Sequence, residues 1–212
     1  MVDYPSRPTD KRSLRSRNAI ENALIRLLKT QPLESITVTS LISEAGYSRT
    51  AFYNNYMDIR DCLDCLINRH AEQFYNVLIE YGNRSISNIG EPITYPGNVH
   101  ELFFRAPYEL VYSNKDFYSV LILLPEQYIF AFINNVLGRL NVEESFELKG
   151  FETENVNAEL WLWSYVWDTI GRVIFWIKNG MIYSPEYMGR QQYLKRLDKI
   201  YMKTKDSKDK SK

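Results

Sequence analysis

The stretch TVTSLISEAGYSRTAFYNNY, residues 37–56, predicts two short helices joined by a tight turn. Thr37 is suited to cap the first helix, because its hydroxyl can accept a hydrogen bond from a backbone N–H one turn later. Gly46 is suited to end that helix, since a residue without Cβ adopts the left-handed conformation at little cost. Ser48 is suited to cap the second helix. This order of signals predicts a helix–turn–helix.

The second helix combines a narrow apolar stripe with a broad polar face. Phe52 and Tyr56 are four residues apart and therefore lie on one side of the helix. The remaining faces carry side chains that can form hydrogen bonds: Arg49, Thr50, Tyr53, Asn54 and Asn55. A helix this short is not stable alone and must pack on a larger body. A packed helix with a polar outer face is what reading the DNA major groove requires.

The stretch resembles the DNA-binding segment of the TetR family of bacterial regulators, over roughly residues 10–80. The resemblance rests on residues that stand where this family usually shows Thr-Val, Ile, Ala-Gly, Ser, Tyr and Phe: Thr37-Val38, Leu41, Ala45-Gly46, Ser48, Tyr53 and Tyr56. It implies an all-α fold, in which a three-helix DNA-binding head is joined by a long helix to a helical ligand-binding and dimerisation body. It also implies a homodimeric repressor that a small-molecule effector releases from a palindrome in double-stranded DNA.

The resemblance further implies a set of DNA-contacting residues: Thr37, Thr39, Arg49, Thr50, Tyr53, Asn54, Asn55 and Arg60. Arg49 and Thr50 are expected to read base edges, because arginine bonded to guanine is the commonest specific contact. The expected phosphate contacts, which fix the register of a protein on DNA, are Thr37, Thr39, Tyr53 and Asn55.

Three positions depart from the family pattern and favour a different function. Ile59 stands where a phosphate-binding lysine is usual, Asn55 replaces a frequent histidine, and Ala51 replaces a frequent threonine. Losing backbone contacts weakens binding to DNA and flattens its salt dependence, although Arg60 compensates in part. The alternative is therefore a TetR-like protein that acts by binding another regulator.

The charges are unevenly distributed, although the chain carries no net charge. Residues 1–60 hold nine basic and six acidic side chains, and residues 189–212 hold nine and three, so the centre is acidic. A basic head on an acidic body would orient the protein on DNA. We expect residues 1–12 to form a flexible basic arm, which either reaches DNA or only aids solubility. We expect the Lys-rich tail, residues 205–212, to be disordered and solvated.

The helical pattern predicts the head at residues 13–57 and the regulatory and dimerisation domain at residues 58–204. Apolar periodicity and caps predict helices at residues 13–30, 59–81, 99–112, 116–124, 126–141, 157–179 and 184–203. Polar stretches predict loops at residues 83–97 and 142–154.

The body is rich in aromatic residues, which have two interpretations. Large rings with polar tips line pockets for flat or apolar molecules, so they are candidates to bind the effector. The alternative is that they form the core and the subunit interface. The candidate ligand-binding residues are His70, Phe74, Phe103, Tyr108, Tyr112, Phe117, Trp163 and Trp167.

The last two predicted helices carry more apolar surface than one contact face within the chain needs. In the family the corresponding helices pair with those of a second copy in a four-helix bundle, where Gly171 would permit a close approach. The expected interface residues are Trp163, Trp167, Ile170, Gly171, Ile174, Ile177, Tyr193 and Leu197.

Several other classes of function are not indicated. The sequence shows no nucleophile paired with a base, no paired carboxylates in an apolar setting and no phosphate-binding glycine loop, so we expect no enzyme. Cys62 and Cys65 have a metal-site spacing, but the chain has two histidines and two cysteines, and buried packing residues are favoured over metal ligands. We expect no cofactor. No signal peptide or membrane span is visible, which predicts a cytoplasmic protein.

Overall fold

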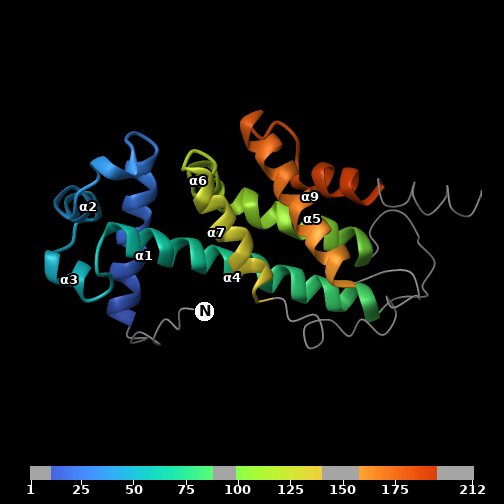
Figure 1. Cartoon of the computed structure of the whole chain (residues 1–212), viewed down its shortest axis with the longest axis horizontal. Helices are drawn as coiled ribbons and strands as arrows, with labels where there is room; N and C mark the ends of the chain where they lie inside the picture. The colour runs from blue at the N-terminus through green and yellow to red at the C-terminus, as the bar shows by residue number, and fades with distance from the viewer. Residues whose placement is uncertain (1–10, 88–98, 140–157, 195–212) are drawn as a thin grey trace, which may run out of the picture.

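The computed structural model describes residues 11–87, 99–139 and 158–194, and all regular structure in these ranges is helical (Figure 1). The head contains α1 (Lys11–Leu28), a 3₁₀ turn η1 (Leu33–Ser35), α2 (Val38–Ala45) and α3 (Arg49–Tyr53). The long helix α4 (Ile59–Ser87) leads from the head along the body. The body adds α5 (Val99–Ser113), α6 (Lys115–Leu121), α7 (Glu126–Leu137), α9 (Ala158–Lys178) and a helix at residues 185–194. The predicted all-α class, with a head joined to a body by a long helix, is confirmed.

The helix–turn–helix forms through the local signals that predicted it. The Thr37 hydroxyl accepts from the Ser40 backbone N–H (3.1 Å), and the Ser40 hydroxyl accepts from the Thr37 N–H (3.0 Å). These reciprocal bonds satisfy two donors that the first turn of a helix would otherwise leave open. Gly46 ends α2 in the left-handed region at φ +70°. The Ser48 hydroxyl then accepts from the Ala51 N–H (3.2 Å) and caps α3.

One apolar core runs through the head and the body. In the head, Leu24 of α1, Leu41 of α2 and Phe52 of α3 are fully buried together. Leu63 and Leu66 of α4 belong to the same cluster and extend it toward the body. Since α3 has five residues, its orientation is set by this shared core rather than by its own backbone hydrogen bonds.

A buried polar network joins the head to α4. Glu21 of α1 is 1% exposed, forms an ion pair with Arg69 of α4, and accepts from the Tyr56 hydroxyl (2.8 Å). Arg69 also donates to the Asn18 side chain (3.0 Å). Burial raises the pKa of the Glu21 carboxyl, and Arg69 and Tyr56 oppose that shift. The network ties α1, the end of the helix–turn–helix and α4 into one unit.

Some boundaries differ from the predicted ones. Helix α4 continues to Ser87, so residues 83–87 of the predicted loop are helical, and α1 begins at Lys11 rather than at residue 13. The rest of that loop, the loop predicted at residues 142–154, the tail and most of the arm lie outside the described residues. No helix in the described ranges is both long and apolar enough to cross a membrane.

Candidate nucleic-acid interface

The outer face of α3 is polar and lies at the far end of the head (Figure 1). Arg49, Thr50, Tyr53 and Asn54 are all exposed, and Tyr53 is 55% exposed. The Tyr53 ring packs edge-on against buried Phe52, with 5.3 Å between ring centroids. The Tyr53 ring is therefore supported by the core on one side while more than half of the side chain is exposed, which suits a contact to DNA.

Arg49 is held in place by a residue of the preceding helix. Its Nη2 donates to the Thr39 hydroxyl at 2.6 Å, and both side chains are exposed. This bond leaves other guanidinium donors available, because arginine has five N–H groups. Thr37 is also exposed, at the N-cap of α2. Four of the predicted contacts, Thr37, Thr39, Arg49 and Thr50, thus lie on the outer side of the helix–turn–helix.

Asn55 was predicted to contact phosphate, but the structure corrects this prediction, because the side chain is buried and only 3% exposed. Its amide donates to the Ala51 carbonyl (2.7 Å) and to the Ser16 hydroxyl (3.4 Å), and its carbonyl accepts from the Ser13 hydroxyl (3.1 Å). These partners occupy the amide inside the head. Asn55 therefore fastens the C-terminal end of α3 to α1 and cannot reach DNA in this arrangement.

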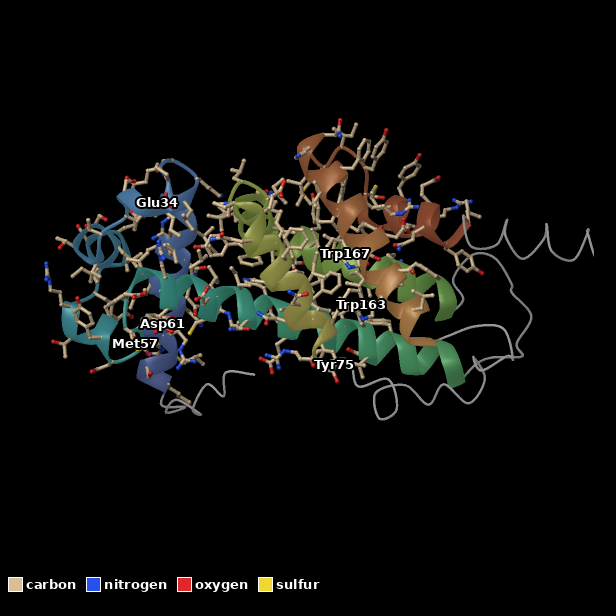
Figure 2. The ribbon with its side chains drawn as sticks, in the orientation of Figure 1. Glu34, Met57, Asp61, Tyr75, Trp163 and Trp167 are labelled. Carbon is tan, nitrogen blue, oxygen red and sulfur yellow. The ribbon has the colours of Figure 1, made fainter. Side chains whose placement is uncertain are left out.

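The start of α4 carries an acidic cluster of Asp58, Asp61 and Asp64, in which the sequence indicated only Asp58, as the cap of the helix. The Asp58 carboxylate accepts from the Asp61 N–H (2.8 Å), and the Asp61 carboxylate accepts from the Met57 N–H (2.7 Å); Figure 2 labels Met57 and Asp61. Desolvation, together with Asp61 and Asp58, raises the pKa of Asp64. The chain's own carboxylates thus occupy amides that could otherwise bind phosphate. The sequence signal for this cluster is that Asp58, Asp61 and Asp64 are spaced three residues apart. Arg60 is exposed beside them.

Three of the predicted ligand-binding residues gather in the interior where α4 meets α6 and α7. The His70 ring stacks on Phe117 with 3.7 Å between centroids, and Phe74 packs edge-on against Phe132 at 5.7 Å. Burial, together with Arg69, lowers the pKa of His70 to about 3, so the ring is neutral near pH 7. His70 Nδ1 and the nearby Tyr118 hydroxyl are buried without a hydrogen-bond partner among the described residues.

The other predicted ligand-binding residues do not join this group. Phe103 and Tyr108 of α5 are buried against α9, and Tyr108 donates to the Gln192 side chain (2.8 Å). Tyr112, Trp163 and Trp167 lie at the surface. The eight candidates therefore lie in separate places, and their part in binding a ligand stays a prediction.

The predicted interface residues also divide between the surface and the core. Trp163 and Trp167 are 43% and 38% exposed (Figure 2), and Gly171 is exposed with them. Ile174 and Ile177 are partly buried. The structure corrects the prediction for Ile170 and Tyr193, because both side chains are buried within one chain. The centroid of the Tyr193 ring lies 5.8 Å from that of the Phe104 ring. Leu197 lies outside the described residues.

The two cysteines are free thiols near the start of α4. Cys62 is fully buried in the core and Cys65 is partly buried. Burial raises the pKa of the Cys62 thiol, which keeps it protonated and unreactive. The interpretation of Cys62 as a buried packing residue is confirmed.

Comparison with known proteins identifies the fold. No family model and no curated protein matches the sequence. Among solved structures, a TetR-family regulator from Syntrophomonas wolfei matches with a TM-score of 0.64 and 17% identity, over 84% of this chain and 91% of that one. The fatty acid degradation regulator FadR from Bacillus halodurans matches with a TM-score of 0.61 and 12% identity, over 84% and 93%. FadR from Bacillus subtilis in complex with stearoyl-CoA matches with a TM-score of 0.54 and 15% identity, over 83% and 95%. The resemblance in the helix–turn–helix is thus confirmed across most of the chain, which has the fold of the TetR-family transcriptional regulators.

Proposed function

We propose that the protein is a sequence-specific DNA-binding transcriptional regulator, and that it acts as a repressor. The observation that carries this proposal is the outer face of α3, where Arg49 is held by Thr39 beside exposed Thr50 and Tyr53. Arg49 and Thr50 would read base edges, while Thr37, Thr39 and Tyr53 would contact phosphates. Asn54 and Arg60, both exposed, would contribute to the same surface.

A homodimer would allow the protein to read a longer DNA site than one copy can. One five-residue helix contacts few bases, and two copies related by a two-fold axis would place their α3 helices in successive major grooves, roughly 34–36 Å apart. Such an assembly binds a palindrome. The exposed Trp163 and Trp167 of α9 support dimerisation, because large exposed rings are costly unless a partner covers them.

A small-molecule effector would act through the body. The interior between α4, α6 and α7 combines aromatic rings with two buried polar groups without partners, His70 Nδ1 and the Tyr118 hydroxyl. These groups would be satisfied by an apolar molecule that carries a hydrogen-bonding group. Because one neighbour of this fold is a FadR in complex with stearoyl-CoA, long-chain acyl-CoA is the first class to screen. An effector shifts DNA binding only if its affinity differs between two states of the protein.

The proposal is tested by footprinting the purified protein on the DNA that flanks its own gene, over a series of salt concentrations. The wild type is compared with Tyr53→Ala and with Tyr112→Ala, which removes a similarly exposed ring from the body. We expect the wild type and Tyr112→Ala to protect a palindrome that Tyr53→Ala loses. Weak binding that ignores sequence and is equal in all three proteins would contradict the proposal.

A second candidate function is regulation through another protein rather than through DNA. The acidic start of α4 favours it, because Asp58 and Asp61 occupy the helix N-terminus where a phosphate would otherwise bind. Met57 beside them is 77% exposed, which leaves an apolar side chain at the end of the head. If the footprint shows only weak binding that ignores sequence, this candidate is tested by co-purifying partner proteins with the wild type and with Met57→Lys. A partner that binds the wild type and not Met57→Lys would support it.

A further inference from the structure

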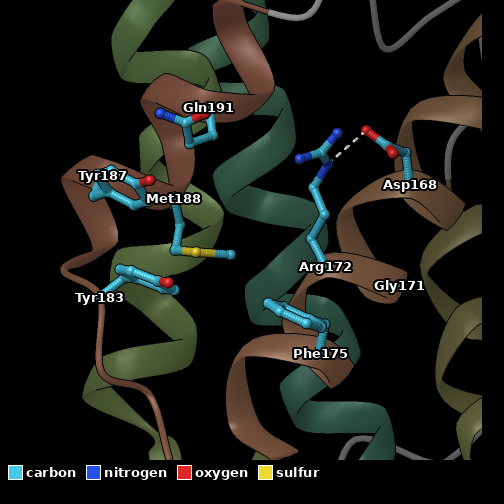
Figure 3. Close-up of a pocket in the computed structure, with 8 residues that line it drawn as sticks. All are labelled: Asp168, Gly171, Arg172, Phe175, Tyr183, Tyr187, Met188 and Gln191. Atoms are coloured by element: carbon cyan, nitrogen blue, oxygen red, sulfur yellow. Dashed lines mark hydrogen bonds and ion pairs between the residues drawn. The ribbon is translucent and has the colours of Figure 1, made fainter. Parts of the chain in front are cut away.

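A hollow of about 540 Å³ lies between the C-terminal half of α9 and the helix at residues 185–194 (Figure 3). Its size is in the range of small-molecule sites, roughly 300–1,000 Å³. A Cβ at Gly171 would meet nothing within 4 Å, so the missing side chain leaves this space open. The hollow shares no residue with the interior between α4, α6 and α7, and it is therefore a separate candidate site. Residues of both helices and of the turn between them line it: Gly171, Arg172, Phe175, Tyr183, Tyr187 and Met188.

The walls of the hollow are aromatic and partly exposed. The rings of Tyr183 and Tyr187 stack on each other, with 4.7 Å between centroids, on the side opposite Arg172 and Phe175. Phe175 is 57% exposed, and the two tyrosines are 40% and 44% exposed. Met188 is buried and closes the hollow toward the core. Aromatic rings prefer stacked or edge-on contacts with other rings, so these walls favour a flat aromatic ligand over a flexible chain.

The charged groups of the hollow are paired within the chain. Arg172 and Asp168 form an ion pair at 3.0 Å, and the Gln192 amide donates to the same Asp168 oxygen (3.3 Å). A ligand with a negative charge would be placed beside Asp168, and one with a positive charge beside Arg172. Covering a charge that has no partner is costly. The hollow therefore favours a ligand without a net charge.

We propose that the hollow binds a flat, uncharged aromatic molecule that carries a carbonyl group. The ring would lie between the two tyrosines and Phe175, and the carbonyl oxygen would accept a hydrogen bond from Arg172. The ion pair with Asp168 uses Arg172 Nε. Because arginine has five N–H donors, others remain to bind the carbonyl.

This site goes beyond the proposed function, whose effector would occupy the interior at His70. It also differs from the surface that supports dimerisation, because Trp163 and Trp167 do not line the hollow. Pairing of two copies through these two rings therefore does not by itself fill it.

NMR of the full-length protein, labelled at the methionine methyl groups, tests the site directly. Met188 lines the hollow, whereas Met57 lies in the head and serves as an internal reference. The Met188 signal is the one that Met188→Leu lacks. The probe is naphthamide, which is flat and uncharged and carries a carbonyl group. We expect it to shift the Met188 signal through its ring current and to leave the Met57 signal unchanged.

Two matched probes test the proposed chemical class. Naphthoate has the same ring with a negative charge, and cyclohexanecarboxamide has the same amide without a flat ring. Each should bind roughly tenfold more weakly than naphthamide, because the first places a charge beside Asp168 and the second loses the stacking.

Three variants test the walls of the hollow. Gly171→Leu should abolish the response of Met188, because the new side chain occupies the open space without a clash at its Cβ. Ser164→Leu, at an exposed position of the same helix outside the hollow, should bind as the wild type does. Arg172→Lys keeps a charge beside Asp168 but loses the planar fork of donors, so it should bind roughly tenfold more weakly.

Several outcomes would overturn the site: a Met188 signal that does not respond up to the solubility limit of naphthamide, equal binding of the three probes, or undiminished binding by Gly171→Leu. Sedimentation of the same samples identifies one cause, since a second copy that covers the hollow would give a dimer in which Met188 does not respond. A protected palindrome in the footprint would leave the proposed function intact in each case.

Discussion

Arg69 of α4 forms an ion pair with the buried carboxylate of Glu21 on α1, and the next residue of α4, His70, stacks on Phe117 of α6. Two consecutive residues of α4, Arg69 and His70, therefore contact the head and the body, respectively. A shift of α6 would act on α4 at the point where α4 is fastened to the head. The surface ion pair of Lys29 with Asp116 of α6 (2.7 Å) joins the same two regions but contributes little to stability.

Arg69→Met should destabilise the protein by about 3 kcal/mol at pH 7.5, because it leaves the Glu21 carboxylate buried without its cation. Burial raises the pKa of Glu21 above its ordinary 4.5. Protonation therefore relieves the unpaired charge as the pH falls, and the loss should be smaller at pH 5. Urea unfolding at both pH values measures this, with exposed Arg60→Met as the control. Equal losses at both pH values would contradict the assignment of an unpaired carboxylate.

His70 should make the protein less stable in acid. Its pKa falls from 6.5 to about 3 on folding, so between these values the unfolded chain binds more protons and stability falls as the pH decreases. From pH 6.5 to pH 4.5 this group should remove about 2 kcal/mol. His70→Phe, which keeps a ring against Phe117, should lose less over the same interval in urea unfolding. Parallel pH profiles of the two proteins would refute this role of His70.

Thr39→Val should weaken selective DNA binding, because it removes the acceptor that holds the Arg49 guanidinium. One such hydrogen bond contributes about 0.5–1.5 kcal/mol, or roughly a 2- to 13-fold change in affinity. Thr39→Ser keeps the hydroxyl and should bind as the wild type does. Arg49→Ala should cost more, about 1–3 kcal/mol, and relax specificity. Binding titrations on the footprinted site measure all three. Unchanged selectivity in Arg49→Ala would show that another residue reads the bases.

Asn55→Ala and Arg60→Ala should differ in how their DNA affinity depends on salt. Asn55 binds Ser13, Ser16 and Ala51 inside the head, so its loss should lower stability and leave the salt slope unchanged. Arg60 is exposed, and if it neutralises a phosphate its loss should make the slope less steep by about 0.9. Binding measured from low to moderate salt separates the two effects. A flatter slope in Asn55→Ala would restore it as a phosphate contact.

The helix–turn–helix could be predicted from the sequence because its signals act over a few residues. Thr37 reaches Ser40, Gly46 relieves its own backbone, and Ser48 reaches Ala51. Caps and turns of this kind need no distant partner, so residue types and spacing suffice. The burial of Phe52 and Tyr56 was also predicted from their apolar spacing, although α3 ends at Tyr53 and Tyr56 lies beyond it.

Other features depend on residues that are distant in the chain. Asn55 has the residue type of a phosphate contact, but Ser13 and Ser16 of α1 turn it inward. The pairing of Glu21 with Arg69 has no local signal at all. In α9 both sides are apolar, so periodicity could not separate buried Ile170 from exposed Trp167.

The sequence by itself determined the helices, their caps and the polar face of α3, because these follow from interactions between near neighbours in the chain. Only the tertiary structure decided which side of α9 is buried, where Asn55 points and how α4 holds the head, since these depend on which surfaces meet when distant helices pack.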